Sequence, residues 1–535
     1  MTAAPGEPAK SRYLTPLLIA LLAACIVRFW IVPLPSSFWV DEMVTSFVIH
    51  YGPKHASLTV APQVTETIYY SIPKAAEALF GFSEVVYRVP SVLLMAAALF
   101  FIAQLAARLI HPQAVWFAVF ACLSLKGFNY QAADARPYAM GTAVASAALW
   151  FEIRWLDRGR WSDGLIFTAL AAVLWRVHLI YWPFYAIFAG YAIWRIFERK
   201  TPVTWLRAAS IFVLLALALV PVALRALALA RAAGAHVIVP QPTFRELRSS
   251  YHFLLAFICC GVPWFLAWFF QWPRQAYARL LSAGGVLLAW WLWFPLALFL
   301  YSRVTGNSVF VPRYLSLVLP GTGLAATLLV ACFIPEKTWR PMAAALGIGV
   351  LLFMGQWSVA FPRHDNSNWR EAAQTIKALN LTPATPVIYP SPFIEAKSPV
   401  WRPDYPLPGF LYCHLLIYPV GGTPFLFPFE RSSEAERYAA DLSEQTLSSA
   451  DRFLIYGGDR NVLGWQKWFR QRPEFHDWHS RRLGPFGDVE VALFESPRRP
   501  INSLLAFAPC DRSPAPARSA CASPASARVV SPQLQ

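Results

Sequence analysis

Long apolar stretches, separated by short polar breaks, fill the first two thirds of the chain. Residues 14–32 form the first stretch, and a helix that spans a bilayer needs roughly 20 residues. Pro33 and Pro35 end this helix, because proline cannot continue the hydrogen-bond ladder. Similar stretches predict further spans at 89–110, 114–125, 137–155, 165–174, 179–197, 211–229, 253–270, 281–300, 315–333 and 342–361. On the 20-residue criterion the pattern predicts about eleven crossings.

The connection between the first two spans is long, from residue 33 to about residue 87. Within it, residues 64–80 predict a helix lying on the membrane surface, with Lys74 and Glu77 on its polar side. The second span has Pro90 near its expected start, where the missing N–H of proline would be unpaired in any case.

Beyond residue 363 the pattern changes, since charge and proline content rise and no further span is evident. Helical spacing occurs at 369–379, 433–443 and 464–470, and short apolar runs at 386–389, 452–456 and 489–494 are typical of buried strands. We therefore expect a transmembrane domain at 1–362 and a small α/β domain at 363–500. Residues 501–535 are rich in Pro, Ala and Ser, which predicts a disordered tail.

Composition supports a polytopic α-helical membrane protein. Hydrophobic residues make up 57% of the chain and charged residues 14%, whereas soluble domains carry about 25% charged residues. The net charge of +16 suits contact with anionic lipid or phosphorylated substrates. The basic residues are scattered among apolar segments, which argues against nucleic-acid binding. Lys10 and Arg12 precede the first span, so the N-terminus is expected in the cytoplasm of a plasma (inner) membrane protein and the C-terminal domain outside.

Ionisable residues occur at helix ends that alternation assigns to the extracytoplasmic side. They are Asp41, Glu42, Arg88, Asp134, Arg136, His178 and Arg313. Charge is unfavourable at membrane depth, so such groups tend to pair or to line a functional cavity. The alternative, which applies most strongly to His178, is that each residue only solvates a loop.

Carboxylates and arginines together favour two kinds of chemistry. A carboxylate can take a proton from an acceptor hydroxyl, and arginines can hold a phosphate leaving group through charge-assisted hydrogen bonds. This combination fits transfer from a lipid-linked phosphate donor. It also fits proton-coupled transport, because an intramembrane carboxylate can bind and release a proton.

Five short motifs occur along the chain in a fixed order. They are Trp39-Val40-Asp41-Glu42, Tyr87-Arg88-Val89-Pro90-Ser91, Asp134-Ala135-Arg136-Pro137-Tyr138-Ala139-Met140, Pro312-Arg313-Tyr314-Leu315 and Asn368-Trp369-Arg370-Glu371-Ala372-Ala373. Over about residues 14–494 the set resembles the bacterial family 39 glycosyltransferases of the GT-C superfamily. These are related to the polyprenyl-phosphate-mannose protein mannosyltransferases and the lipid A aminoarabinose transferase.

The resemblance implies inverting transfer of a sugar from polyprenyl phosphate. It assigns Asp41 as the base with Glu42 in support, and Asp134 stands where the family commonly has the longer Glu. The implied substrate contacts are Arg88, Arg136 and Arg313 for donor phosphate, with Tyr138, His178 and Tyr314 beside them. Some relatives bind a divalent metal near the first loop, but no ligand set is evident here. No metal or other cofactor is predicted, and a divalent metal stays open as an alternative.

Two other classes of function remain at this stage. A transporter or flippase of a lipid-linked sugar would more often show two similar halves, and the sequence shows no such symmetry. A silent assembly subunit would not need Asp41 and Asp134, which are both retained. The sugar stays open, as does the acceptor, which could be a lipid, a polysaccharide or a protein. We expect the C-terminal domain to help select that acceptor.

Overall fold

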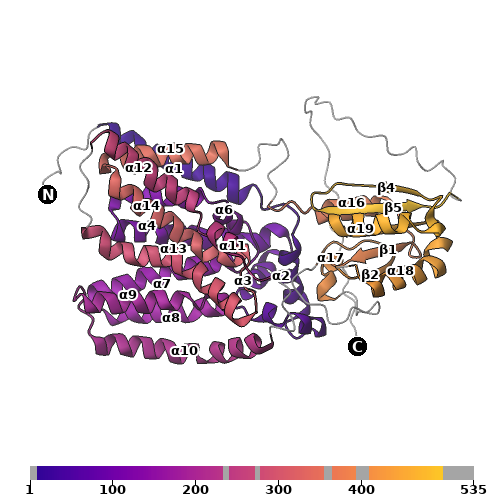
Figure 1. The fold of residues 1–535 in the computed structure, drawn as a ribbon, viewed down its shortest axis with the longest axis horizontal. Coiled ribbons are helices and arrows are strands. Elements are labelled where there is room, and N and C mark those ends of the chain that lie inside the picture. The colour runs from indigo at the N-terminus through magenta and orange to yellow at the C-terminus, as the bar shows by residue number, and fades with distance from the viewer. Residues whose placement is uncertain are drawn as a thin grey trace.

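The computed structural model describes residues 9–232, 240–271, 278–354, 364–392, 409–429 and 431–497. Long helices lie side by side in a bundle, and a mixed α/β unit sits against one end of it (Figure 1). The predicted boundary at residue 362 and the predicted disordered tail at 501–535 both lie outside the described residues.

The helices of the bundle follow the predicted apolar stretches. They are α1 (Ala9–Ile26) with the π-helical turn η1 (Val27–Ile31), α4 (Glu84–Leu109), α5 (Val115–Leu123), α7 (Tyr138–Arg158), α8 (Trp161–Val177), α9 (Phe184–Phe197), α10 (Trp205–Ala232), α12 (Phe253–Phe269), α13 (Ala278–Thr305), α14 (Val318–Phe333) and α15 (Trp339–Phe353). Among the described residues, five segments are long and apolar enough to cross a membrane: Leu14–Ile31, Glu84–Leu109, Trp205–Ala232, Gly284–Thr305 and Pro312–Phe333.

Several helix starts differ from the prediction, and two of them change the setting of a proline or a charged residue. Helix α4 begins at Glu84, where the Ser83 hydroxyl caps it by accepting the Val86 N–H at 3.2 Å. Pro90 therefore lies inside α4 and not near its start. Helix α8 also begins earlier than predicted, and the buried Asp163 in its first turn pairs with Arg154 of α7 at 3.1 Å. This pairing lets a charged residue lie in the helix interface.

The long connection after the first span contains two helices, α2 (Val40–Tyr51) and α3 (Ser71–Phe80). The predicted surface helix thus begins at Ser71, because the chain before it forms the 3₁₀ turn η3 (Pro62–Thr65) and a bend. Helix α2 was not predicted from the sequence. Its apolar residues are buried in one hydrophobic cluster with residues of the C-terminal unit, so its apolar face is covered by a part of the chain far away in sequence.

The C-terminal unit is built on a five-stranded sheet of order β2-β1-β3-β5-β4. Strand β1 (Pro386–Pro390) pairs in parallel with β2 (Thr423–Phe427) and β3 (Arg452–Gly458), and β5 (Val489–Glu495) pairs antiparallel with β3 and β4 (His479–Arg482). The helices are α16 (Trp369–Ala378), the short α17 (His414–Ile417), α18 (Ser433–Gln445) and α19 (Asp459–Arg470). Strands β1, β3 and β5 lie where the apolar runs predict strands.

Strands β2 and β4 were missed for separate reasons. Strand β2 contains Pro424, which lacks the N–H that a central strand needs, and it lies at the sheet edge where proline is tolerated. Strand β4 is a short run of polar residues at the opposite edge. Neither strand has the alternation on which sequence patterns depend.

Candidate active site

The first turn of α2 carries both carboxylates of the first motif, Asp41 and Glu42. A helix N-terminus favours negative charge, and the Trp39 N–H donates to Glu42 Oε2 at 3.3 Å, which closes the turn. Adjacent residues on a helix point about 100° apart. Asp41 and Glu42 therefore enter two different surroundings.

Asp41 meets two guanidinium groups. Its Oδ2 lies 3.0 Å from Arg313 Nε and 4.0 Å from an Arg136 nitrogen. Arg136 also donates to the Asp41 backbone carbonyl at 3.1 Å, and Arg313 lies over the ring of Trp39 at 5.8 Å. These arginines come from the chain before α7 and from η7 (Pro312–Leu317), so the fold brings together residues that are far apart in sequence.

A cavity of about 570 Å³ opens beside Asp41. Arg136 and Arg313 line its charged end. Its remaining wall is mainly apolar, with α10 contributing Ala223, Ala226, Leu227, Leu229 and Ala230, and with Trp175, Trp182 and Tyr301 among the other lining residues. The cavity therefore combines a charged end with a long apolar surface, which suits an amphiphilic ligand.

His178 and Tyr314 also line the cavity, and Tyr138 packs behind them. The ring centroids of His178 lie 5.9 Å from Tyr138 and 5.1 Å from Tyr314. Burial, helped by the nearby charges of Arg136 and Arg313, lowers the pKa of His178 to about 3. The ring is therefore neutral, and since Nδ1 accepts the N–H of Ile180 at 3.4 Å, its proton is on Nε2.

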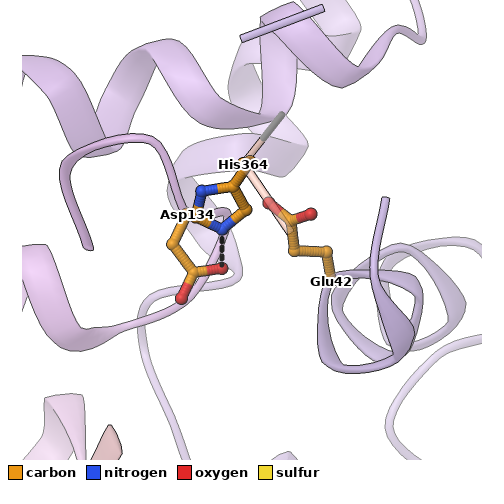
Figure 2. A group of neighbouring side chains, drawn as sticks. All are labelled: Glu42, Asp134 and His364. Carbon is orange, nitrogen blue, oxygen red and sulfur yellow. Dashed lines mark ion pairs between the residues drawn. The ribbon is translucent and has the colours of Figure 1, made fainter. Parts of the chain in front are cut away.

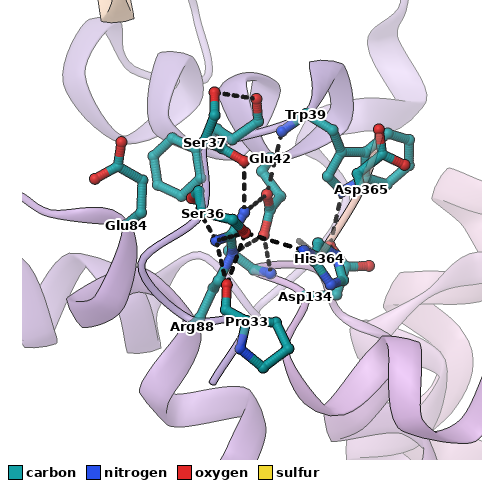
Figure 3. A network of polar contacts seen from close by, with 12 residues as sticks. Pro33, Ser36, Ser37, Trp39, Glu42, Glu84, Arg88, Asp134, His364 and Asp365 are labelled. Atoms are coloured by element: carbon teal, nitrogen blue, oxygen red, sulfur yellow. Dashed lines mark hydrogen bonds and ion pairs between the residues drawn. The ribbon is translucent and has the colours of Figure 1, made fainter. Parts of the chain in front are cut away.

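Glu42 turns the other way and binds Arg88, which comes from α4 (Figure 3). Glu42 Oε1 accepts from Arg88 Nε at 2.7 Å and from the Ala135 N–H at 2.8 Å, and its other oxygen pairs with the same guanidinium. Both side chains are fully buried. The other Arg88 N–H groups donate to carbonyl groups of the preceding loop, those of Leu34, Ser36 and Ser37, at 2.7–3.0 Å.

This placement does not fit the predicted contact between Arg88 and a donor phosphate. Its nitrogens are fully buried, and each is already bonded to Glu42 or to loop carbonyls. Arg88 instead orders the loop that leads into α2. The sequence placed Arg88 at a helix end, but it did not show that Glu42 and the loop would enclose the side chain.

Asp134 lies next to His364, a histidine outside the five motifs, and Figure 2 shows both side chains near Glu42. Trp39 Nε1 donates to Asp134 Oδ1 at 3.0 Å, and His364 Nε2 is 3.5 Å from the same oxygen. Burial raises the pKa of Asp134 to about 7 and lowers the pKa of His364. The His364 ring packs against Tyr130, with centroids 4.1 Å apart.

Glu42, Asp134 and His364 are the described residues with metal-ligand geometry. Each offers one ligand atom, and these atoms lie within 4.8 Å of one another. However, each Glu42 oxygen already accepts two N–H groups, and a carboxylate has about four lone-pair sites in total. A cation at this position would therefore have to displace one of the N–H groups that Glu42 accepts.

His364 and Tyr70 lie at the site but belong to none of the five motifs. His364 precedes the Asn368 motif by four residues, at the junction of the two domains, and this position was the available signal. Tyr70 lines the cavity and donates to the Val64 carbonyl at 2.9 Å. It lies in the segment that was predicted to be a surface helix, so nothing in the pattern directed it toward the site.

Comparisons with known proteins agree with this architecture. Residues 69–224 match the family model for dolichyl-phosphate-mannose-protein mannosyltransferase. The chain is similar to crystal structures of ArnT from Cupriavidus metallidurans in the apo state and bound to undecaprenyl phosphate. The sequence identities are 13% and 12% and the TM-scores 0.53 and 0.51, and each alignment covers 90% of this chain and 98% of ArnT. The chain therefore shares its fold with ArnT. A search of curated proteins gave no match.

Proposed function

We propose that this chain is a GT-C protein and an inverting membrane glycosyltransferase that moves a sugar from a polyprenyl-phosphate donor to an acceptor of the cell envelope. The observation that carries the proposal is the meeting of Asp41 with Arg136 and Arg313 at the charged end of a largely apolar cavity. The proposal includes about eleven crossings on the 20-residue criterion, with the C-terminal unit and the site on the extracytoplasmic side.

In this proposal, charged groups bind the donor's phosphate and an apolar surface binds its lipid chain. Its phosphate lies against Arg136 and Arg313, which can give charge-assisted hydrogen bonds, and its polyprenyl chain follows the apolar wall formed by α10. One of the similar ArnT structures contains undecaprenyl phosphate, which supports a lipid of this kind. His178 and Tyr314 lie beside the same space and offer polar groups to the sugar.

Transfer then needs one displacement. Asp41 takes the proton of the acceptor hydroxyl as the acceptor oxygen attacks the anomeric carbon. The bond between that carbon and the phosphate oxygen breaks, and polyprenyl phosphate leaves with its new charge held by the two arginines. Attack from the face opposite the leaving phosphate inverts the anomeric centre. The charges of Arg136 and Arg313 balance the phosphate, so the proposal includes no metal.

The test compares wild type with Asp41→Asn in lipid, using a panel of polyprenyl-phosphate sugars and an extract of envelope acceptors. Release of polyprenyl phosphate is followed with and without EDTA. Asp163→Asn is the matched control, because Asp163 is also a buried, arginine-paired carboxylate but belongs to α8 away from the cavity. We expect release by wild type and by Asp163→Asn, with and without EDTA, and a loss of about 10²–10⁴-fold in folded Asp41→Asn.

Two results would overturn this proposal. Release by Asp41→Asn at the wild-type rate would remove Asp41 as the base. Movement of intact lipid-linked sugar across the bilayer, without its consumption, would replace the transferase by a transporter.

A further inference from the structure

The loop from Pro33 to Phe38 leads directly into the first turn of α2, so its position sets the position of Asp41. From the membrane domain, Arg88 of α4 binds the carbonyls of this loop, as described above. The Phe38 ring also packs against Tyr87, with centroids 5.6 Å apart, and Arg88 lies over it at 5.3 Å. One side of the loop is thus fixed within the bundle.

The C-terminal unit holds the other side of the same loop. Arg370, in the first turn of α16, donates from its side chain to the Pro35 carbonyl at 3.0 Å and from its backbone N–H to Ser37 Oγ at 3.2 Å. Tyr418, which follows α17, accepts the Phe38 N–H on its hydroxyl at 2.8 Å. These bonds join segments that are more than 300 residues apart in sequence.

Both residues are anchored on α4 through Glu84. Arg370 Nε donates to Glu84 Oε1 at 3.0 Å, and the Tyr418 hydroxyl donates to the same oxygen at 2.8 Å. Burial, with the charge of Glu84, raises the pKa of Tyr418, so its hydroxyl keeps the proton that this bond requires. Glu84 and Arg88 are four residues apart and share one face of α4. One face of one helix therefore fixes the loop directly and through the C-terminal unit.

We propose that Arg370 and Tyr418 are positioning residues for the transfer reaction, and that the C-terminal unit forms part of the active-site framework by holding the loop before Asp41. This inference rests on the proposed function, because the position that it concerns is that of the proposed base. It goes beyond the expectation that the unit helps to select the acceptor. Neither residue lines the cavity, so each acts through the loop.

The test uses the full-length protein in lipid and four variants. Tyr418→Phe removes only the hydroxyl, Arg370→Met removes the guanidinium donors, and Arg370→Lys keeps the charge. Arg431→Met is the matched control, since Arg431 forms a half-exposed pair with Glu436 elsewhere in the same unit at 2.8 Å. Rates of polyprenyl phosphate release give kcat and the donor KM, and hydrogen–deuterium exchange reports the amides of residues 33–40.

A misplacement of about 1 Å can lower a rate about 10²-fold. We therefore expect kcat to fall about 10–100-fold in Tyr418→Phe and Arg370→Met while the donor KM stays within about twofold. Arg370→Lys should recover part of the rate, and exchange of the loop amides should rise in the impaired variants alone. Arg431→Met should match wild type in each measurement.

Wild-type kcat together with wild-type loop exchange in Tyr418→Phe and Arg370→Met would overturn the inference. If wild type itself releases no polyprenyl phosphate, the proposed function fails, and the exchange data still decide whether the unit holds the loop. A rise in KM with unchanged kcat would also contradict positioning, because that pattern reports lost binding of the donor.

Discussion

Removing one partner of the buried Glu42–Arg88 pair should destabilise the protein more than removing one partner of an exposed ion pair on the same helix. The variants that test this difference in stability are Glu42→Gln, Arg88→Met and the double variant. Both side chains are fully buried, and removal of one partner from such a pair costs about 3–5 kcal/mol, because the remaining charge is buried without compensation. Arg88 retains its loop carbonyls in Glu42→Gln, so we expect a loss near the lower end, about 3 kcal/mol.

Arg108→Met is the matched control, because Arg108 lies on the same helix and also pairs with a carboxylate. Its side chain is 52% exposed, and its partner Asp157 keeps a second pair with Arg195 at 2.9 Å. Such a pair contributes less than about 1 kcal/mol. The control therefore separates the effect of burial from that of losing an arginine on α4.

Reversible unfolding by SDS in mixed micelles gives the free energy of unfolding for each variant. We expect the double variant to lose less than the sum of the two single losses, with a coupling of about 2 kcal/mol or more, since it leaves no unpaired charge. Single variants as stable as Arg108→Met, or losses that simply add, would refute the reasoning from burial.

Two further predictions follow from the cavity and the C-terminal unit. Arg313→Met should raise the donor KM about 10–100-fold, because a hydrogen bond to a charged group contributes about 1.5–3 kcal/mol; an unchanged KM in initial-rate assays would exclude the phosphate contact. Burial lowers the pKa of His414 to about 3, compared with about 6.5 in the unfolded chain. The contribution of the neutral His414 ring to the free energy of unfolding is therefore complete above pH 6.5 and falls as the pH drops below that value. Between pH 7 and pH 5 this lowers the free energy of unfolding of the wild type by about 2 kcal/mol. His414→Phe should not show this His414-dependent decrease when the unfolding midpoints of both proteins are measured at the two pH values. An equal decrease in both proteins would contradict the prediction.

The sequence predicted the elements whose surroundings are local. Apolar stretches predicted the helices of the bundle because lipid and neighbouring helices both favour such residues, and β1, β3 and β5 were found because central strands are continuously apolar. Helix α2 was missed because its apolar face is buried against a unit that begins more than 300 residues later. No local pattern records that contact.

The sequence predicted part of the site and missed the part that depends on tertiary packing. Asp41, Arg136 and Arg313 could be grouped because alternation placed their helix ends on one side, and the structure brings them together. Arg88 had the same sequence signal, yet it lies outside the cavity with its nitrogens bonded to Glu42 and the loop. Whether an arginine contacts a ligand or has a structural role depends on which groups surround it in the fold. A local sequence pattern does not contain that information.

The division of work between Asp41 and Glu42 follows from helix geometry. Two carboxylates adjacent in sequence would repel one another if both faced one space, but on a helix they point about 100° apart. Asp41 then faces the cavity with its charge near Arg136 and Arg313. Glu42 instead accepts hydrogen bonds from Arg88 and from two backbone N–H groups. Removing Asp41 should therefore abolish transfer in a folded protein, and removing Glu42 should first reduce stability. A helix start at Val40 is thus as important to the site as the two carboxylates, because a shift of one residue would rotate both side chains by about 100° away from their present partners.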